Sequence, residues 1–180
     1  MNQICIKINS PEQMQKLGVD IVSCAYPNLV IALVGDLGAG KTTLTKGIGL
    51  ALGIKRVINS PTFTIMKVYD TMHANIKKLY HLDVYRLTNS SSDFELEEYF
   101  YLDGLTVIEW AHIIDDMLPN NTWEIEINDL GNNERKVTIK AEDNLIKKIE
   151  EEKYEIEKSE CTVYGGSYVC INVCCSCSSR

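Results

Sequence analysis

One short segment constrains this chain more than any other part of it. The segment reads Gly35-Asp36-Leu37-Gly38-Ala39-Gly40-Lys41-Thr42. Its glycines, lysine and hydroxyl stand at the offsets of a phosphate-binding loop. The segment follows the apolar run 29–34, typical of a buried strand, and precedes a helical pattern over 42–52. Because this order turns backbone N–H groups and a helix N-terminus toward phosphate oxygens, it predicts a nucleotide site.

The mechanism of such a loop predicts a role for each residue. Lys41 is expected to reach the β- and γ-phosphates of ATP, and Thr42 to ligate Mg²⁺. A glycine turn before an ordinary helix is the structural alternative. The residues predicted to bind the nucleotide are Gly35, Gly38, Ala39, Gly40, Lys41, Thr42 and Thr43.

A magnesium ion in this setting also needs an acidic residue at a neighbouring strand end. Two candidates exist: Asp83 follows the run 79–82, and Glu109 follows the run 105–108. Either run delivers its carboxylate to the carboxyl edge of a strand. From spacing alone, each acid is either a metal support or an ion-paired surface residue.

The remaining periodicity indicates one α/β domain over residues 1–150. Ser10 and Pro11 predict the start of a helix that runs to about residue 25. The segments 63–69 and 76–83 are expected to pair antiparallel because their link is too short for a crossover helix. The other predicted elements are strands 3–8, 105–109, 123–127 and 135–140, a turn over 128–133, a loop over 88–95, and short helices near Glu97 and over 111–117. The predicted fold is a P-loop NTPase domain with a central mixed β-sheet flanked by helices, parallel around the nucleotide site and antiparallel near the later hairpins.

Residues 151–180 are expected to form a poorly ordered tail, first charged and then rich in cysteine. Its thiols are Cys161, Cys170, Cys174, Cys175 and Cys177. Their spacing does not fit the usual paired arrangement of a zinc site, in which two residues separate each pair of cysteines. The tail therefore predicts no specific function.

Charge and hydropathy limit the classes of partner. The net charge of −7 gives no basic surplus that would hold RNA by itself. No apolar stretch approaches the roughly 18 residues of a membrane span. The sequence thus predicts a cytoplasmic protein that has no membrane partner. It also predicts that this protein reaches nucleic acid through other proteins.

Several segments together resemble the TsaE (YjeE) family. Besides the loop at 35–43, the resemblance rests on three short motifs at defined distances from it. They are Ser60-Pro61-Thr62-Phe63, His81-Leu82-Asp83-Val84-Tyr85-Arg86 and Ile108-Glu109-Trp110. The resemblance covers roughly residues 10–119.

This resemblance implies further roles at the site. Thr62 would lie in a switch-like loop near the γ-phosphate, and Asp83 would hold the metal directly or through water. Glu109 would either ligate Mg²⁺ or position the attacking water, while Trp110 would cover the nucleotide or serve as a core aromatic. His81 lies on the strand face of Asp83 and can orient that carboxylate, or it is a structural histidine.

The resemblance also implies a function: a Mg²⁺-dependent ATPase, weak alone and activated by partners, that supports formation of threonylcarbamoyladenosine at position 37 of tRNA. Its partner would be a protein complex of the TsaB/TsaD type, with tRNA contacted only through that complex. Two alternatives are a nucleotide-gated interaction module without turnover and a small-molecule kinase. A kinase should show an arginine-rich lid, and the arginines at 56, 86, 135 and 180 form no cluster in the sequence.

Overall fold

The computed structural model describes residues 1–87, 98, 100, 103–152 and 154–156. The predicted loop over 88–95, the short helix near Glu97 and the cysteine-rich tail all lie outside these residues.

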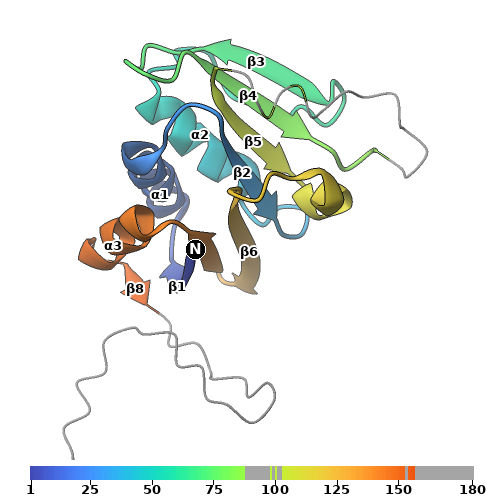
Figure 1. The fold of residues 1–180 in the computed structure, drawn as a ribbon. Helices are drawn as coiled ribbons and strands as arrows, with labels where there is room; N and C mark the ends of the chain where they lie inside the picture. The colour runs from blue at the N-terminus through green and yellow to red at the C-terminus, as the bar shows by residue number, and fades with distance from the viewer. Residues whose placement is uncertain (88–97, 99, 101–102, 153, 157–180) are drawn as a thin grey trace, which may run out of the picture.

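A single mixed sheet organises the described residues (Figure 1). Its strand order is β3-β4-β5-β2-β6-β7-β1-β8. The strands β4, β5, β2 and β6 run parallel to one another, and the remaining pairings are antiparallel. The bounds are β1 (Asn2–Ile8), β2 (Leu29–Val34), β3 (Met66–Asp70), β4 (Lys78–Asp83), β5 (Leu105–Glu109), β6 (Trp123–Gly131), β7 (Glu134–Ala141) and β8 (Glu155–Ile156). The predicted mixed sheet is confirmed, with its parallel strands at the centre.

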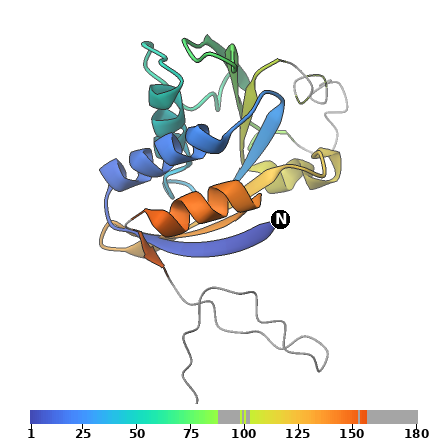
Figure 2. The ribbon, with the colours of Figure 1, turned by 60° about the vertical axis from the view of Figure 1, so that its left-hand side comes forward.

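Three α-helices cover one face of the sheet (Figures 1 and 2). They are α1 (Pro11–Cys24), α2 (Lys41–Ala51) and α3 (Asp143–Glu151). Their apolar side chains share one core with the facing side chains of β2, β5, β6 and β7. The 3₁₀ helix η2 (Ala111–Met117) packs with the opposite face, where Ile114 joins Ala32 and Ile108. The sheet is therefore covered on both sides, which explains the continuous apolar runs of β2 and β5.

Local sequence signals account for the first helix. The Ser10 hydroxyl caps α1 by accepting a hydrogen bond from the Gln13 N–H (3.2 Å), and Pro11 occupies the first helical position. The residues at the helical period, Met14, Leu17 and Ile21, are all buried. The predicted helix is thus confirmed.

The helices α1 and α2 touch through glycines that leave no room for a side chain. A Cβ at Gly47 would lie 2.1 Å from the carbonyl oxygen of Gln15, and a Cβ at Gly18 would lie 2.5 Å from that of Leu44. This contact places the N-terminal half of α1 beside the helix that begins at the phosphate-binding loop.

Because Gly47 packs against backbone, Gly47→Ala should destabilise the fold even though alanine favours helices. Overpacking of this kind costs about 1–3 kcal/mol in the free energy of unfolding. Urea denaturation measures it, with Lys46→Ala on the exposed side of α2 as the matched control. A Gly47→Ala protein as stable as the wild type would show that the two helices do not approach so closely.

Three predicted boundaries differ from the structure. The domain does not end at residue 150, because Tyr154 is buried against Asp20 and β8 pairs with β1. The turn expected over 128–133 is shorter, since β6 continues to Gly131 and pairs with Glu134. The strand expected from residue 63 begins at Met66.

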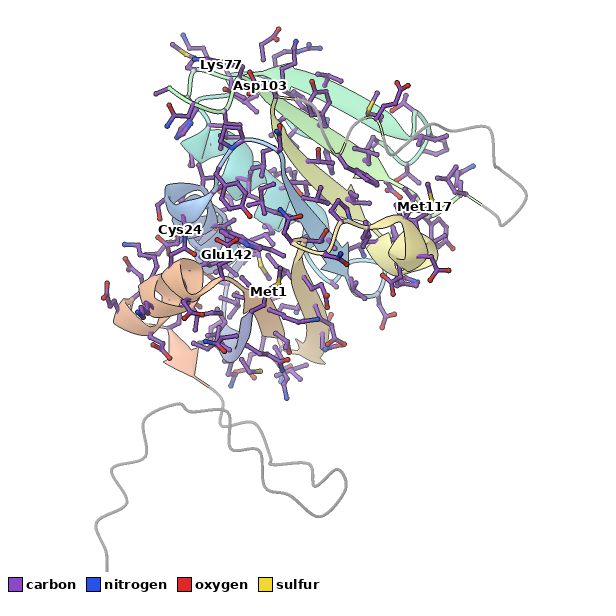
Figure 3. All side chains as sticks on the ribbon, in the orientation of Figure 1. Met1, Cys24, Lys77, Asp103, Met117 and Glu142 are labelled. Carbon is purple, nitrogen blue, oxygen red and sulfur yellow. The ribbon has the colours of Figure 1, made fainter. Side chains whose placement is uncertain are left out.

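The ends of the sheet can be told apart in Figure 3. Lys77 and Asp103, which precede β4 and β5, lie at one end, and Met117 of η2 lies toward the other. The carboxyl ends of the parallel strands therefore meet at the end where η2 begins. Among the residues that the structure describes, none of the helices has the length and apolar character of a membrane span.

Candidate nucleotide-binding site

The loop 35–40 connects β2 to α2 and turns at three glycines with positive φ. The angles are 143° at Gly35, 80° at Gly38 and 118° at Gly40. A side chain at Gly35 would also meet the Ile127 carbonyl oxygen at 2.3 Å, whereas one at Gly38 would meet nothing within 4 Å. Gly38 is thus required for its backbone conformation alone. The predicted loop geometry is present, and the loop leads directly into the N-terminus of α2.

Lys41 is the first residue of α2 and is almost completely buried, with 4% of its surface exposed. Its ammonium donates hydrogen bonds to the carbonyl oxygens of Gly35 (2.6 Å) and Asp36 (2.8 Å). Burial lowers the pKa of Lys41, and the negative charges of Glu109, Asp83 and Asp36 oppose that shift. The chain therefore holds a buried cation within the loop, next to carboxylates.

Thr42 and Glu109 are in direct contact. The Thr42 hydroxyl donates to the Glu109 carboxylate, at 2.9 Å from Oε1 and 3.2 Å from Oε2. Glu109 ends β5, which is the parallel neighbour of β2, and only 3% of its surface is exposed. Parallel neighbours end at the same edge of a sheet, which brings together two residues that are 67 positions apart. Thr42 and Glu109, two of the three predicted magnesium ligands, thus lie side by side.

Asp83 takes a different set of partners. It is paired in register with Glu109 across β4 and β5. Its Oδ2 accepts hydrogen bonds from the hydroxyls of Ser60 and Thr62 (2.7 Å each), and its Oδ1 accepts one from the Tyr85 N–H (3.1 Å). Asp83 therefore anchors the loop that contains Thr62, the predicted switch residue.

His81 contacts Glu109 and not Asp83, the carboxylate considered for it in the sequence. Its Nε2 lies 2.8 Å from Glu109 Oε1, and the ring is fully buried. Of the two roles considered for His81, orientation of Asp83 does not occur in the structure. The reason is geometric: side chains two positions apart on a strand are about 6.6 Å apart, whereas neighbouring strands are about 4.8 Å apart.

Aromatic side chains border the site. The Trp110 ring lies over Lys41, with 3.9 Å from Nζ to the ring centroid, and contacts the Tyr85 ring at 4.7 Å. Trp110 has a φ of 64°, a left-handed conformation that a non-glycine residue seldom adopts. This turn carries the chain from Glu109 into η2 and sets the indole beside the loop.

On its outer side the loop borders a cavity of about 80 Å³. Apolar side chains of Ile8, Pro11 and Met14 form part of its lining, and Gly38, Ala39, Gly40 and Thr43 supply the loop side. Arg135 completes it and donates from Nε to the Ala39 carbonyl oxygen (3.0 Å). Arg135 is a site residue that the sequence does not reveal, because 96 positions separate it from Ala39 and no local motif marks it.

The donor set suits a metal that binds together with phosphate. Among the described residues, no group of three or more histidine, cysteine or acidic side chains is placed to hold a metal ion. Thr42 and Glu109 nevertheless offer hard oxygen donors next to a phosphate-binding loop, and Mg²⁺ is usually held by one or two carboxylates plus substrate phosphates. The residues therefore fit Mg²⁺ bound with a nucleotide.

The fold and the loop define the class of this protein as a P-loop NTPase domain. The family model described as "Threonylcarbamoyl adenosine biosynthesis protein TsaE" matches residues 8–137, and the chain belongs to this TsaE family.

Individual relatives agree with the family match. The chain is 42% identical over 152 residues to the tRNA threonylcarbamoyladenosine biosynthesis protein TsaE of Bacillus subtilis, covering 84% of this chain and 94% of the relative. The TsaE protein of Treponema pallidum is 41% identical over 112 residues, covering 61% of this chain and 80% of that one. The crystal structure of Bacillus subtilis YdiB is similar with a TM-score of 0.68 and 36% identity, covering 83% of this chain and 93% of that structure.

Proposed function

We propose that this protein binds ATP with Mg²⁺ and hydrolyses it to support threonylcarbamoyladenosine formation at position 37 of tRNA, in the cytoplasm. The observation that carries the proposal is the contact between Thr42 and Glu109 beside Lys41. A phosphate-binding lysine, a magnesium-binding hydroxyl and a buried carboxylate are the three groups that phosphoryl transfer to water requires. Family membership supplies the pathway, since the relatives are named for it.

Each residue then has a physical task. The backbone of residues 35–40 and the Lys41 ammonium compensate the charge of the β- and γ-phosphates. The Thr42 hydroxyl and the Glu109 and Asp83 carboxylates would hold a divalent cation, which would neutralise charge on the phosphate oxygens. Glu109 orients water or ligates the metal, and the Trp110 ring excludes solvent from Lys41. The cavity of about 80 Å³ bordered by Met14, Thr43 and Arg135 lies against the loop, and in this proposal it receives part of the nucleoside.

The surroundings of the site favour a protein partner, which we propose is a complex of the TsaB/TsaD type. Three side chains at its rim are exposed, namely Leu37 (91%), Phe63 (86%) and Tyr85 (57%). The Arg86 guanidinium lies over the Phe63 ring, 4.6 Å from its centroid. Because Ser60 and Thr62 bond to Asp83, a change at the γ-phosphate can be passed to Phe63 and so to a partner. The net charge of −7 agrees with tRNA being held by that partner.

Reconstitution tests this function. Purified chain, the partner pair and unmodified tRNA should yield the modified nucleoside over repeated rounds with ATP and Mg²⁺. A non-hydrolysable ATP analogue should not sustain those rounds. Unchanged product formation without this chain would contradict the proposal, and sustained formation with the analogue would favour a nucleotide-gated module. Phosphate transfer to a small acceptor, in the absence of the partners, would favour a kinase.

Thr42→Ala should weaken ATP binding through the metal, because it removes a hydroxyl ligand and leaves the loop backbone intact. We expect affinity for Mg-ATP to fall by about 10-fold, the cost of one good ligand or charged hydrogen bond. Raising the Mg²⁺ concentration should restore part of it. Thr42→Ser keeps the hydroxyl and is the matched control. A loss of affinity that does not respond to Mg²⁺ would remove Thr42 from the metal site.

A further inference from the structure

His81 is a fully buried polar residue of β4. It lies on the α2-facing side of β4, between the buried Leu79 and the site residue Asp83, and none of its surface is exposed. Its Nε2 contacts Glu109, while its Nδ1 has no hydrogen-bond partner. A leucine here would avoid the cost of a buried, unpaired nitrogen. Packing alone therefore does not explain the histidine.

The contact determines how the Glu109 carboxylate is oriented. Nε2 of His81 faces a carboxylate oxygen, which is a hydrogen-bond acceptor, and we therefore assign the ring hydrogen to Nε2. Oε1 then receives both His81 (2.8 Å) and Thr42 (2.9 Å), whereas Oε2 receives only the longer contact from Thr42 (3.2 Å). The last side-chain torsion of glutamate, χ3, takes a broad range of angles, so it does not by itself fix the orientation of the carboxylate plane. Two donors from different elements fix that plane and leave Oε2 with accepting capacity.

We propose that His81 is a positioning residue that acts through Glu109: it holds Oε1 so that Oε2 is available to the water or the metal at the γ-phosphate. This inference rests on the proposed function, in which Glu109 serves hydrolysis. It gives His81 a role in the rate of the chemical step and none in holding the nucleotide. The His81 side chain contacts Glu109, which lies outside the phosphate-binding loop.

Two amide substitutions separate positioning from burial of a polar group. In His81→Gln the amide nitrogen reaches the place of Nε2, and in His81→Asn it reaches only the place of Nδ1. We expect His81→Asn to lower single-turnover ATP hydrolysis by roughly 10- to 100-fold, the size expected for a misplaced catalytic group. His81→Gln should retain most of the rate. Affinity for Mg-ATP should stay near the wild-type value in both, and urea denaturation checks that both are folded.

A double-mutant cycle then tests whether His81 acts through Glu109. If it does, His81→Asn has little further effect on hydrolysis in a Glu109→Gln background. An equal fold-loss in both backgrounds would overturn the proposal, as would a His81→Gln rate as low as that of His81→Asn.

A readout that does not depend on activity keeps the inference separate from the proposed function. NMR of the histidine ring nitrogens should show His81 with its hydrogen on Nε2, and Glu109→Gln should shift the His81 signals while leaving those of His73 and His112 in place. If the wild type hydrolyses no ATP but this shift occurs, the ATPase function fails and the orientation of Glu109 by His81 still holds. A hydrogen on Nδ1 would refute the positioning role.

Discussion

Replacing Lys41 with alanine is expected to weaken ATP binding by about 10- to 100-fold, because a hydrogen-bonded charge contributes about 1.5–3 kcal/mol. Hydrolysis should fall further, by roughly 100-fold or more, since the ammonium also stabilises charge that develops in the transition state. Lys41 is the buried cation of the loop, and its neighbours Glu109 and Asp83 carry negative charge that would otherwise repel phosphate.

The matched control is Lys46→Ala, an exposed lysine on the same helix. Calorimetric titration with ATP measures affinity, and phosphate release measures turnover. Wild-type affinity and turnover in Lys41→Ala would discard the assignment of the phosphate-binding loop. Equal losses in both variants would point to a general effect of charge.

Glu109→Gln is expected to have the largest effect on the chemical step. If Glu109 orients or deprotonates the attacking water, hydrolysis should fall by about 100- to 10,000-fold, the range for loss of a general base. Glutamine keeps an acceptor for Thr42 and His81, so affinity for Mg-ATP should change by less than about threefold. The variant should then accumulate with ATP bound and remain in the ATP state on its partner complex.

Asp83→Asn provides the comparison, because its carboxylate lies next to Glu109 in the sheet but bonds to Ser60 and Thr62. We expect it to reduce Mg²⁺-dependent affinity and to loosen the switch loop, with a smaller effect on single-turnover hydrolysis. If Glu109 is a metal ligand and not the base, both variants will weaken binding in the same Mg²⁺-dependent manner. Near-normal binding and hydrolysis in both would remove the two acids from the site.

The elements nearest the site were the ones that sequence patterns predicted best. The runs 29–34 and 105–109 are buried on both faces and therefore read as strands whatever surrounds them. The hairpin of β6 and β7 was predicted too short because residues 128–131 extend past the core, where no buried face imposes alternation. The strand predicted from Phe63 begins later because Ser60 and Thr62 are held by Asp83, a tertiary contact that overrides local preference.

The sequence predicts which residues form the candidate site, but not which of them contact one another. Motif spacing identified Lys41, Thr42, Asp83 and Glu109, all of which the sheet gathers at one edge. Which carboxylate meets Thr42 depends on strand order, which one sequence does not contain. The same holds for His81, whose partner lies on the neighbouring strand, and for Arg135, which reaches Ala39 from β7.

The most direct measurement is single-turnover release of γ-phosphate from ATP bound to the wild-type chain, with and without the TsaB/TsaD-type partner pair. We expect slow release by the chain alone and faster release with the partners, because exposed Phe63 and Leu37 border the site and a partner would cover them. Chelating Mg²⁺ should stop the release, because the cation neutralises charge on the phosphate oxygens. If ATP stays intact with the partners, Mg²⁺ and tRNA all present, this protein is not an ATPase, and the proposed function is contradicted.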